Sequence, residues 1–245
     1  MPTKLTPLGL LKKYLRNHGH LLRFFKLANS KAVYTAIFGD YDDLKPLIKQ
    51  KGFDYIVFTD NPNLKSKEYK VILCTPQYDD PCRNSRYYKI NPHIVLKDYD
   101  YSIWIDANIK VTHPDFNQLL AKYLFERDIA LHINPARDCI YKAALNCIRL
   151  KKDDEKTIDD QMIKYRKEFY PENNGLVSCG ILYRRHTKKV EEFNNYWWHE
   201  IKFNSRRDQL SFNYVAWKTG IEFYLISGHV TLGNVDGFTY YYHKK

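Results

Sequence analysis

The chain has 245 residues, of which 44% are hydrophobic, so it can bury a sizeable core. This excludes a disordered protein and fits one large α/β domain or two small ones. Its formal net charge of +11 favours polyanionic partners such as nucleotide phosphates, acidic glycans, anionic lipid or nucleic acid. The five cysteines are odd in number and form no CxxC pair, which argues against a disulfide framework or a zinc site and for a reducing compartment.

Residues 1–30 form a basic segment, because they contain several Lys and Arg residues and no Asp or Glu occurs before Asp40. Apolar residues recur in this segment at helical spacing, which predicts a basic amphipathic helix able to lie on an anionic membrane surface through residues 8–27. An ordinary helix packed on the domain explains the same pattern. No apolar run is long enough to span a membrane or to act as a secretion signal. We therefore expect a cytoplasmic protein, peripheral at the inner face of a membrane if the helix binds lipid.

The folded domain is predicted to cover residues 31–245 and to begin with a strand at 31–38. In a nucleotide-binding sheet, the turn after the first strand lies beside the base and ribose. Five residues at this turn are therefore donor-binding candidates: Phe38, Gly39, Asp40, Tyr41 and Asp42. A solvated acidic turn is the simpler interpretation. A short helix at 44–51 and strands at 54–59 and 69–73 are expected next, and Asp60, after the second of these strands, is a further donor-binding candidate.

Residues 82–97 are predicted to be helical, with a kink or restart at Pro92 because proline lacks the backbone donor that the helix needs. Arg86, Lys89 and His93 fall along one edge of this helix. Such an edge could hold a diphosphate or an acidic sugar, and Arg83 is a further donor-binding candidate. The alternative is a solvated basic face.

The strand that ends at Ile105 is the centre of the prediction. An apolar run of the kind that is buried on both faces is followed by Asp106-Ala-Asn108. In extended backbone these two polar side chains point the same way, and carboxylate and amide oxygens suit Mn²⁺ or Mg²⁺. Asp106 and Asn108 are therefore predicted to bind a divalent metal beside a diphosphate. The simpler interpretation is an Asp that caps a turn.

The remaining chain alternates between the two element types. Helices are predicted at 115–123, 139–150, 155–169, 190–201 and from 205 or 208 onward, and strands at 128–134, 177–183 and 221–226. Gly180, inside a strand, predicts close approach by a ligand or another backbone. The other candidates are Asp208 and Gln209 as catalytic residues, His132, Asn174 and Gly175 on the acceptor side, and His229 or His243 as a third metal ligand. The simpler interpretation of Asp208 is a helix cap.

Four motifs carry a more specific resemblance: Tyr34-Thr-Ala-Ile-Phe-Gly-Asp-Tyr-Asp42, Arg83-Asn-Ser-Arg-Tyr-Tyr-Lys-Ile-Asn-Pro-His93, Ser102-Ile-Trp-Ile-Asp-Ala-Asn-Ile109 and Arg207-Asp-Gln-Leu-Ser-Phe212. Together they resemble the glycosyltransferase-like family of the plant seed-mucilage proteins, over roughly residues 31–228. The resemblance implies a GT-A fold, which is a Rossmann-like, mostly parallel mixed sheet flanked by helices in a single domain.

The resemblance also implies a function. We expect metal-assisted transfer of a hexose-type sugar from a nucleoside diphosphate sugar, in particular a UDP-sugar, to a glycan or glycolipid. Asn108 stands where such enzymes carry a second acid, and one charge fewer should weaken the affinity for Mn²⁺ or Mg²⁺. Two rival classes are a nucleic-acid-binding module and a membrane-peripheral scaffold without activity. Nucleic acid is not expected as a partner, because the basic residues concentrate in the first 30 positions instead of along a reading helix.

Overall fold

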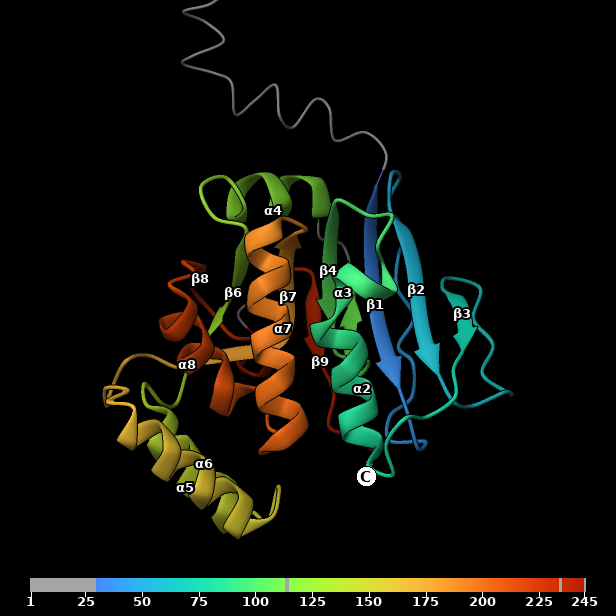
Figure 1. Cartoon of the computed structure of the whole chain (residues 1–245). Helices are drawn as coiled ribbons and strands as arrows, with labels where there is room; N and C mark the ends of the chain where they lie inside the picture. The colour runs from blue at the N-terminus through green and yellow to red at the C-terminus, as the bar shows by residue number, and fades with distance from the viewer. Residues whose placement is uncertain (1–29, 113–114, 234, 245) are drawn as a thin grey trace, which may run out of the picture.

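Seven strands form one mixed sheet in the computed structural model, which describes residues 30–112, 115–233 and 235–244 (Figure 1). The strand order is β3 (Lys70–Leu73), β2 (Asp54–Thr59), β1 (Lys31–Ile37), β4 (Tyr101–Ile105), β7 (Val177–Arg185), β6 (Ile129–Ile133) and β8 (Tyr224–Ile226). Strand β7 is antiparallel to both its neighbours, and every other pairing in this sheet is parallel. The predicted fold class, a mostly parallel α/β sheet in a single domain, is confirmed.

The central strands are buried on both faces, as their apolar runs predict. In β4 all five residues are buried, and in β1 all but the first. Successive side chains of β4 point to opposite faces, so Trp104 packs in one hydrophobic cluster whereas Ile103 and Ile105 pack in the other. Two cores therefore sandwich the sheet, and polar groups reach a ligand only at the ends of its strands.

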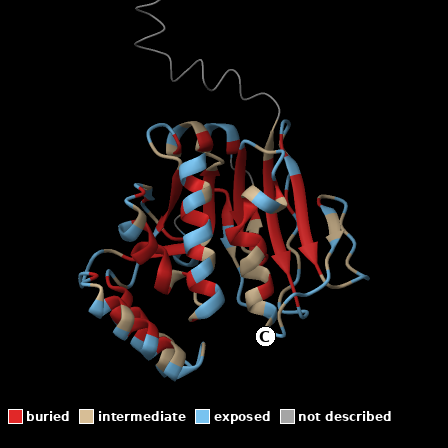
Figure 2. Ribbon diagram, viewed as in Figure 1, coloured by how far each residue is buried: buried red, intermediate tan, exposed pale blue. Residues whose placement is uncertain are grey.

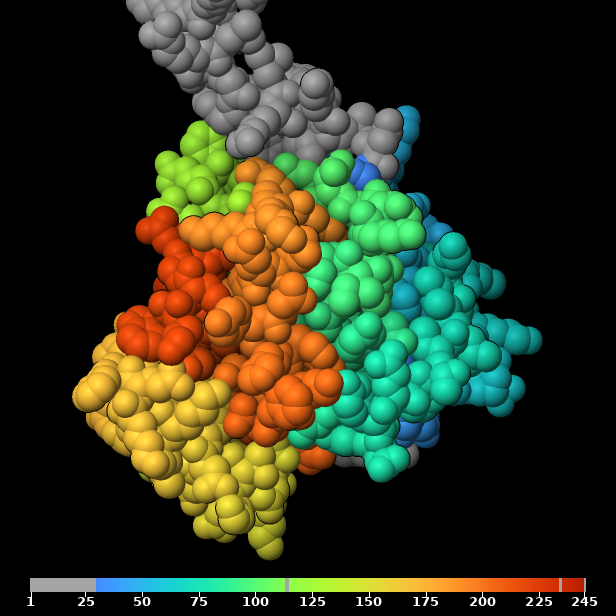
Figure 3. All heavy atoms as spheres, in the orientation of Figure 1, coloured from blue at the N-terminus to red at the C-terminus, as the bar shows by residue number. Residues whose placement is uncertain are grey.

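Helices cover one face of the sheet most heavily (Figures 2 and 3). This layer contains α2 (Pro81–Ile90), α3 (Pro92–Val95), α7 (Lys188–Phe203) and α8 (Gln209–Thr219). The pair α5 (Ile140–Arg149) and α6 (Glu155–Lys167) extends the same core beyond the ends of the strands, where α5 packs on α8 (Figure 1). On the other face pack α4 (Phe116–Tyr123) and a two-stranded sheet of β5 (Ile109–Val111) and β9 (Phe238–Tyr240). A 3₁₀ turn, η1 (Val230–Leu232), connects β8 to this small sheet.

Most predicted elements lie within two residues of their observed bounds, and the restart at Pro92 is confirmed because α2 ends and α3 begins on either side of Asn91. The helix predicted at 44–51 is wrong. Pro46 disfavours helical backbone in the residue before it, and Leu47 instead makes a bridge to Val111. The strand predicted at 221–226 begins only at Tyr224.

The basic helix predicted in residues 1–30 lies outside the described residues, except for Ser30. Across the described ranges, no helix is both long enough and apolar enough to cross a membrane.

Candidate functional site

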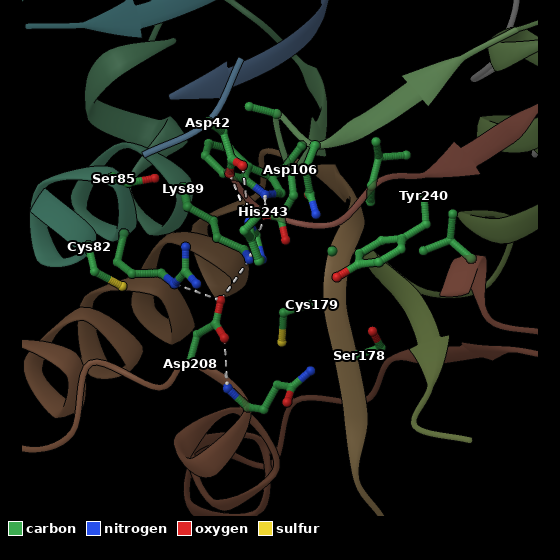
Figure 4. Close-up of a pocket in the computed structure, with 18 of the residues that line it drawn as sticks. Asp42, Cys82, Ser85, Lys89, Asp106, Ser178, Cys179, Asp208, Tyr240 and His243 are labelled. Atoms are coloured by element: carbon green, nitrogen blue, oxygen red, sulfur yellow. Dashed lines mark hydrogen bonds and ion pairs between the residues drawn. The ribbon is translucent and has the colours of Figure 1, made fainter. Parts of the chain in front are cut away.

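A cavity of about 360 Å³ opens at the carboxyl edge of the parallel strands (Figure 4). Its wall combines the ends of β1 and β4, the inner side of α2, the first residues of β7, the start of α8 and the C-terminal tail. Ligands of open α/β sheets bind outside the carboxyl ends of their strands. The cavity is therefore the candidate functional site.

Asp106 follows β4 directly and lies in a turn. The N–H of Ile109 donates to the Asp106 carbonyl at 2.9 Å, so the extended geometry predicted for residues 106–108 is wrong. Asp and Asn side chains favour turns, and both Asp106 and Asn108 still line the cavity. The close approach predicted for Gly180 is confirmed. Its carbonyl accepts from the Asp106 N–H at 2.8 Å, and a Cβ added to it would lie 3.5 Å from Asp106 Oδ2.

Two cations and two carboxylates form a charge network in the cavity wall (Figure 4). Lys89 Nζ lies 2.6 Å from Asp208 Oδ2 and 3.3 Å from Asp106 Oδ1, and Arg86 Nε lies 3.0 Å from Asp208 Oδ2. The Lys89 side chain is 1% exposed and that of Asp208 5%, whereas the Asp106 side chain is 26% exposed. Trp104 Nε1 also donates to Asp106 Oδ1, at 2.6 Å. The paired charges balance, which allows them to be buried.

Asp208 is also the N-cap of α8, because its side chain accepts from the Gln209 N–H at 2.9 Å. Burial alone would raise the pKa of Asp208, but the charges of Arg86 and Lys89 outweigh burial and hold this pKa well below its usual range. Asp208 is therefore ionised at neutral pH and is a weak proton acceptor. Gln209 lines the cavity next to it.

The C-terminal tail brings a histidine to the cavity. Asn108 Nδ2 donates to the Tyr241 carbonyl at 2.7 Å, and the Tyr241 N–H donates to the Asn108 carbonyl at 2.9 Å. Beyond this anchor, His243 Nδ1 lies 2.9 Å from Asp42 Oδ2, in the turn after β1. The side chains of Asp42 and His243 thus converge with those of Lys89 and Asp106 (Figure 4).

The four predicted metal ligands differ in how far their donor atoms are already engaged. Asp106 Oδ1 accepts from two donors, while Oδ2 lies beside Gly180. The amide of Asn108 uses its nitrogen, which leaves the oxygen as a possible ligand atom. Both ring nitrogens of His229 lie 2.6 Å from hydroxyl oxygens, whereas for His243 the described contact is at Nδ1. Burial lowers the pKa of His229, which keeps it neutral.

A cation at this position would have few carboxylate or imidazole ligands among the described residues. No three Asp, Glu, His or Cys side chains in the described ranges are grouped closely enough to hold a metal ion. Mg²⁺ sites commonly combine one or two carboxylates with water and substrate phosphates. The oxygens of Asp106 and Asn108 fit a cation completed in this way.

Some predicted site residues do not line the cavity: Gly39, Asp40, Asp60, Arg83, His132, Asn174 and Gly175. Arg83 donates to backbone carbonyls at the C-terminal end of α7. Asp60 accepts from the Gly39 N–H at 3.1 Å. The His132 ring is buried, with Nδ1 3.0 Å from the Gly228 carbonyl, and burial lowers its pKa. Asn174 and Gly175 lie in the loop before β7.

Other cavity residues were not among the predicted site residues. Arg137 follows β6 and could have been found by the same reasoning that singled out the residue after β4. Arg207 precedes the predicted acid Asp208 and could have been found from that motif. No sequence pattern marks Ser178 or Tyr240 as a site residue, because only the folded sheet and the returning tail bring them to the cavity.

The comparison with known proteins decides the family. A family model described as TOD1/MUCI70, glycosyltransferase-like domain, matches residues 25–226. The chain belongs to the TOD1/MUCI70 glycosyltransferase-like family. This confirms the resemblance inferred from the four motifs, and it gives the chain a glycosyltransferase-like domain. The match contains Asp106 and Asp208, whereas the tail with His243 lies beyond it.

One curated TOD1/MUCI70 relative is described as the probable hexosyltransferase MUCI70 of Arabidopsis thaliana. It is 24% identical to this chain over 156 residues, which cover 59% of the chain and 26% of the relative. The chain thus matches about a quarter of that relative's length.

Proposed function

We propose that this protein transfers a hexose-type sugar from a nucleoside diphosphate sugar, in particular a UDP-sugar, to a hydroxyl group of a glycan or glycolipid. The observation that carries the proposal is the pair of cations Arg86 and Lys89, held by acids in the wall of a strand-end cavity in a glycosyltransferase-like domain. A departing nucleoside diphosphate gains negative charge, and fixed cations stabilise that charge without reorganising.

The charge of the cavity supports a dianionic donor. Its lining includes four cationic side chains, Arg86, Lys89, Arg137 and Arg207, against three carboxylates, Asp42, Asp106 and Asp208. Arg86 and Lys89 are held in place by Asp208, so their positions are fixed before a donor binds. Arg137 and Arg207 add positive charge around them, and a cavity with surplus positive charge attracts anionic substrates.

The turn after β1 is the proposed base and ribose side. The Tyr41 ring is 40% exposed and lies 5.0 Å from the His243 ring, so these two rings offer a surface on which a base can stack. Asp42 lines the cavity beside them and offers oxygens to the ribose hydroxyls. Donor specificity for UDP would then be set where the tail meets this turn.

Mn²⁺ or Mg²⁺ is proposed at Asp106 and Asn108, with His243 the better placed histidine because both ring nitrogens of His229 already have hydroxyl partners. When bound, such a cation supplies positive charge to the diphosphate. Lys89, 3.3 Å from Asp106, supplies a fixed charge of the same sign from the protein itself. Because this charge is already present, stabilisation of the diphosphate depends less on the metal ion, whose affinity is lowered by having Asn in place of a second acid.

Asp208 is proposed to stabilise positive charge at the reacting sugar carbon. A general base works best when its pKa lies near the working pH, and that of Asp208 is held far below. The structure therefore favours the electrostatic role over proton abstraction. The acceptor is proposed to approach past Gln209, which lines the cavity beside this acid.

The test combines binding and turnover on the whole chain. A panel of nucleoside diphosphate sugars is added with Mn²⁺ or with a chelator, and thermal stability is followed, because a ligand that binds only the folded form raises the melting temperature. Donor turnover is then measured for Asp106→Ala, for Asp208→Ala and for a control, Asp159→Ala, an exposed acid on α6. Both site variants should lose transfer, and the control should keep it.

Two results would count against the proposal. Undiminished transfer by Asp106→Ala, or transfer indifferent to chelator, would remove the metal from the mechanism. The absence of both stabilisation and turnover with every nucleotide sugar would contradict the transferase itself.

A further inference from the structure

Two consecutive arginines, Arg206 and Arg207, precede the acid Asp208, and their side chains have different surroundings. Arg206 does not line the cavity, and its Nη1 lies 3.2 Å from Asp80 Oδ1 and its Nε 3.6 Å from Asp153 Oδ1. Arg207 lines the cavity and is half-buried, and its guanidinium makes no hydrogen bond or ion pair with any residue that the structure describes. A guanidinium with all its donors unused is suited to an anionic group. Arg207 is therefore a candidate ligand-binding residue.

The position of Arg207 fits that of a diphosphate. In the proposed function Tyr41 lies on the side of the base and Asp208 on the side of the sugar, and the diphosphate of a nucleotide sugar connects these two parts. Burial raises the pKa of Tyr41, and the charge of Arg207 opposes this rise. Burial also raises the pKa of Asp208, and Arg207 is one of the cations that lower it. The guanidinium is thus within electrostatic reach of both ends of the donor.

Asp153, in the loop between α5 and α6, holds the two residues before Arg207. Its Oδ2 accepts from Ser205 Oγ at 2.7 Å and from the Arg206 N–H at 2.8 Å. The Arg207 N–H donates in turn to Ser205 Oγ at 3.2 Å. Ser205 is fully buried and the Asp153 side chain is 10% exposed, so these bonds have little competition from water. The backbone that carries Arg207 is therefore fixed before any ligand binds.

Arg206 connects the same loop to α2. Besides Asp153 it contacts Asp80, whose carboxylate caps α2 by accepting from the Cys82 N–H at 3.0 Å. Helix α2 carries Arg86, which also lines the cavity. These ion pairs hold α2 and the loop before α8 in a fixed relative position. Less conformational freedom is then lost when a ligand binds between them.

We propose that Arg207 binds the diphosphate of the donor and that Asp153 is a positioning residue that presents Arg207 to it. This inference rests on the proposed transferase function, which supplies the nucleoside diphosphate. Arg207 donates to phosphate oxygens, whereas Asp153 lies outside the cavity and acts only through the backbone of residues 205–207. The place of Asp153 in the charged run at 151–156 predicts only a solvated turn.

The contact is tested by NMR titrations of the whole chain with UDP and with uridine, in the presence of Mg²⁺. Arg207→Ala should bind UDP about tenfold more weakly, because a hydrogen bond to a charged group contributes at least the ~1.4 kcal/mol of a tenfold change. Uridine carries no phosphate, so its affinity should be unchanged. The matched control is Arg149→Ala, which removes the same charge from an exposed position on α5 outside the cavity and should bind both ligands as the unmodified chain does.

The positioning role is tested by Asp153→Ala, alone and combined with Arg207→Ala. Asp153→Ala should weaken UDP binding by up to about tenfold and leave uridine binding unchanged, whereas a general loss of structure would weaken both. The double variant should bind UDP no more weakly than Arg207→Ala alone, because Asp153 acts through Arg207. Asp153→Asn keeps an acceptor oxygen and should lose less affinity than Asp153→Ala, which separates this role from a failure to fold. Asp159→Ala, which removes an exposed acid of α6, is the control.

The outcomes distinguish this inference from the proposed function. UDP binding that Arg207→Ala does not weaken, or an equal loss for UDP and uridine, would overturn the diphosphate contact. Losses that add in the double variant would overturn the positioning role of Asp153. An unmodified chain that binds neither UDP nor any other nucleoside diphosphate would contradict the proposed function itself, and this inference with it.

Discussion

Lys89→Met tests the charge network that organises the cavity. The ammonium of Lys89 is 1% exposed and lies within 3.3 Å of two carboxylates, so methionine would replace a buried cation with an apolar side chain of similar length. Asp208 would keep Arg86 as a partner, and Asp106 is exposed enough to be hydrated. Removing one partner of a buried ion pair costs about 3–5 kcal/mol. Because Asp208 keeps Arg86 and Asp106 can be hydrated, we expect a loss of stability near the lower end, at about 3 kcal/mol.

The loss is measured as the free energy of unfolding in urea near pH 7.5. For a domain of this size each kcal/mol of lost unfolding free energy lowers the melting temperature by about 2–4 °C, so Lys89→Met should melt about 6–12 °C lower. The lowered pKa of Asp208 contributes stability that is present above the pKa of the unfolded carboxyl and is lost as pH falls through the folded value. Lys89 is one source of this shift. The difference in unfolding free energy between the unmodified protein and Lys89→Met should therefore become smaller below about pH 4.

Two comparisons decide whether the reasoning holds. Lys189→Met, at an exposed position, should change stability by no more than about 0.5 kcal/mol. The double variant Lys89→Met with Asp208→Asn should lose less than the two single losses added together, because the pair is already broken. A loss for Lys89→Met no larger than that of Lys189→Met, together with additive losses in the double variant, would refute the coupling between Lys89 and Asp208.

Further outcomes follow from the same contacts. Arg83→Leu should cost about 1–2 kcal/mol by removing the donor to the α7 carbonyls, and a raised KM for the donor instead would restore Arg83 as a donor-binding residue. Gly180→Val should cost about 1–3 kcal/mol in urea unfolding, because a Cβ there meets Ile109 Cδ1 at 3.2 Å, and unchanged stability would contradict this close packing. Burial lowers the pKa of His186 to about 3, so this histidine should subtract up to about 2 kcal/mol of unfolding free energy as pH falls from 6.5 to 5. His186→Gln should make the unfolding free energy less dependent on pH in this range, and an unchanged pH dependence would contradict the role of His186.

Local patterns predicted the elements because each strand and helix carries its own signature. The apolar run at 103–105 is buried on both faces as expected, and Pro92 divides the helix where its missing donor requires. The failure at 44–51 has an equally local cause, since Pro46 disfavours helical backbone in the residue before it. The pairing of Leu47 with Val111 joins residues far apart in the chain, and no local pattern reports it.

The candidate site was predictable where a local pattern marks a residue, such as the end of a strand, one edge of a helix or the start of a helix. Asp106 and Asn108 were found in this way, because the end of a buried strand is exposed to a ligand whatever the rest of the fold does. The partners of Asp208 could not be found, since Arg86 and Lys89 meet it only when the fold brings α2 to the residue that caps α8. Arg83, one turn before Arg86 on the same helix, points to the end of α7 instead. Which basic residue faces the cavity is therefore a tertiary property.

Asn108 shows why this site carries an amide where a second acid was expected. Its side chain is 1% exposed, and its Nδ2 donates to the Tyr241 carbonyl. A carboxylate at this position would place an acceptor oxygen against another acceptor in a buried contact, and such a pair repels. The amide satisfies the tail with its nitrogen and keeps an oxygen for the cavity. The tail in turn brings His243 to Asp42, so the loss of one negative charge at the strand end and the placement of the returning histidine have the same physical cause.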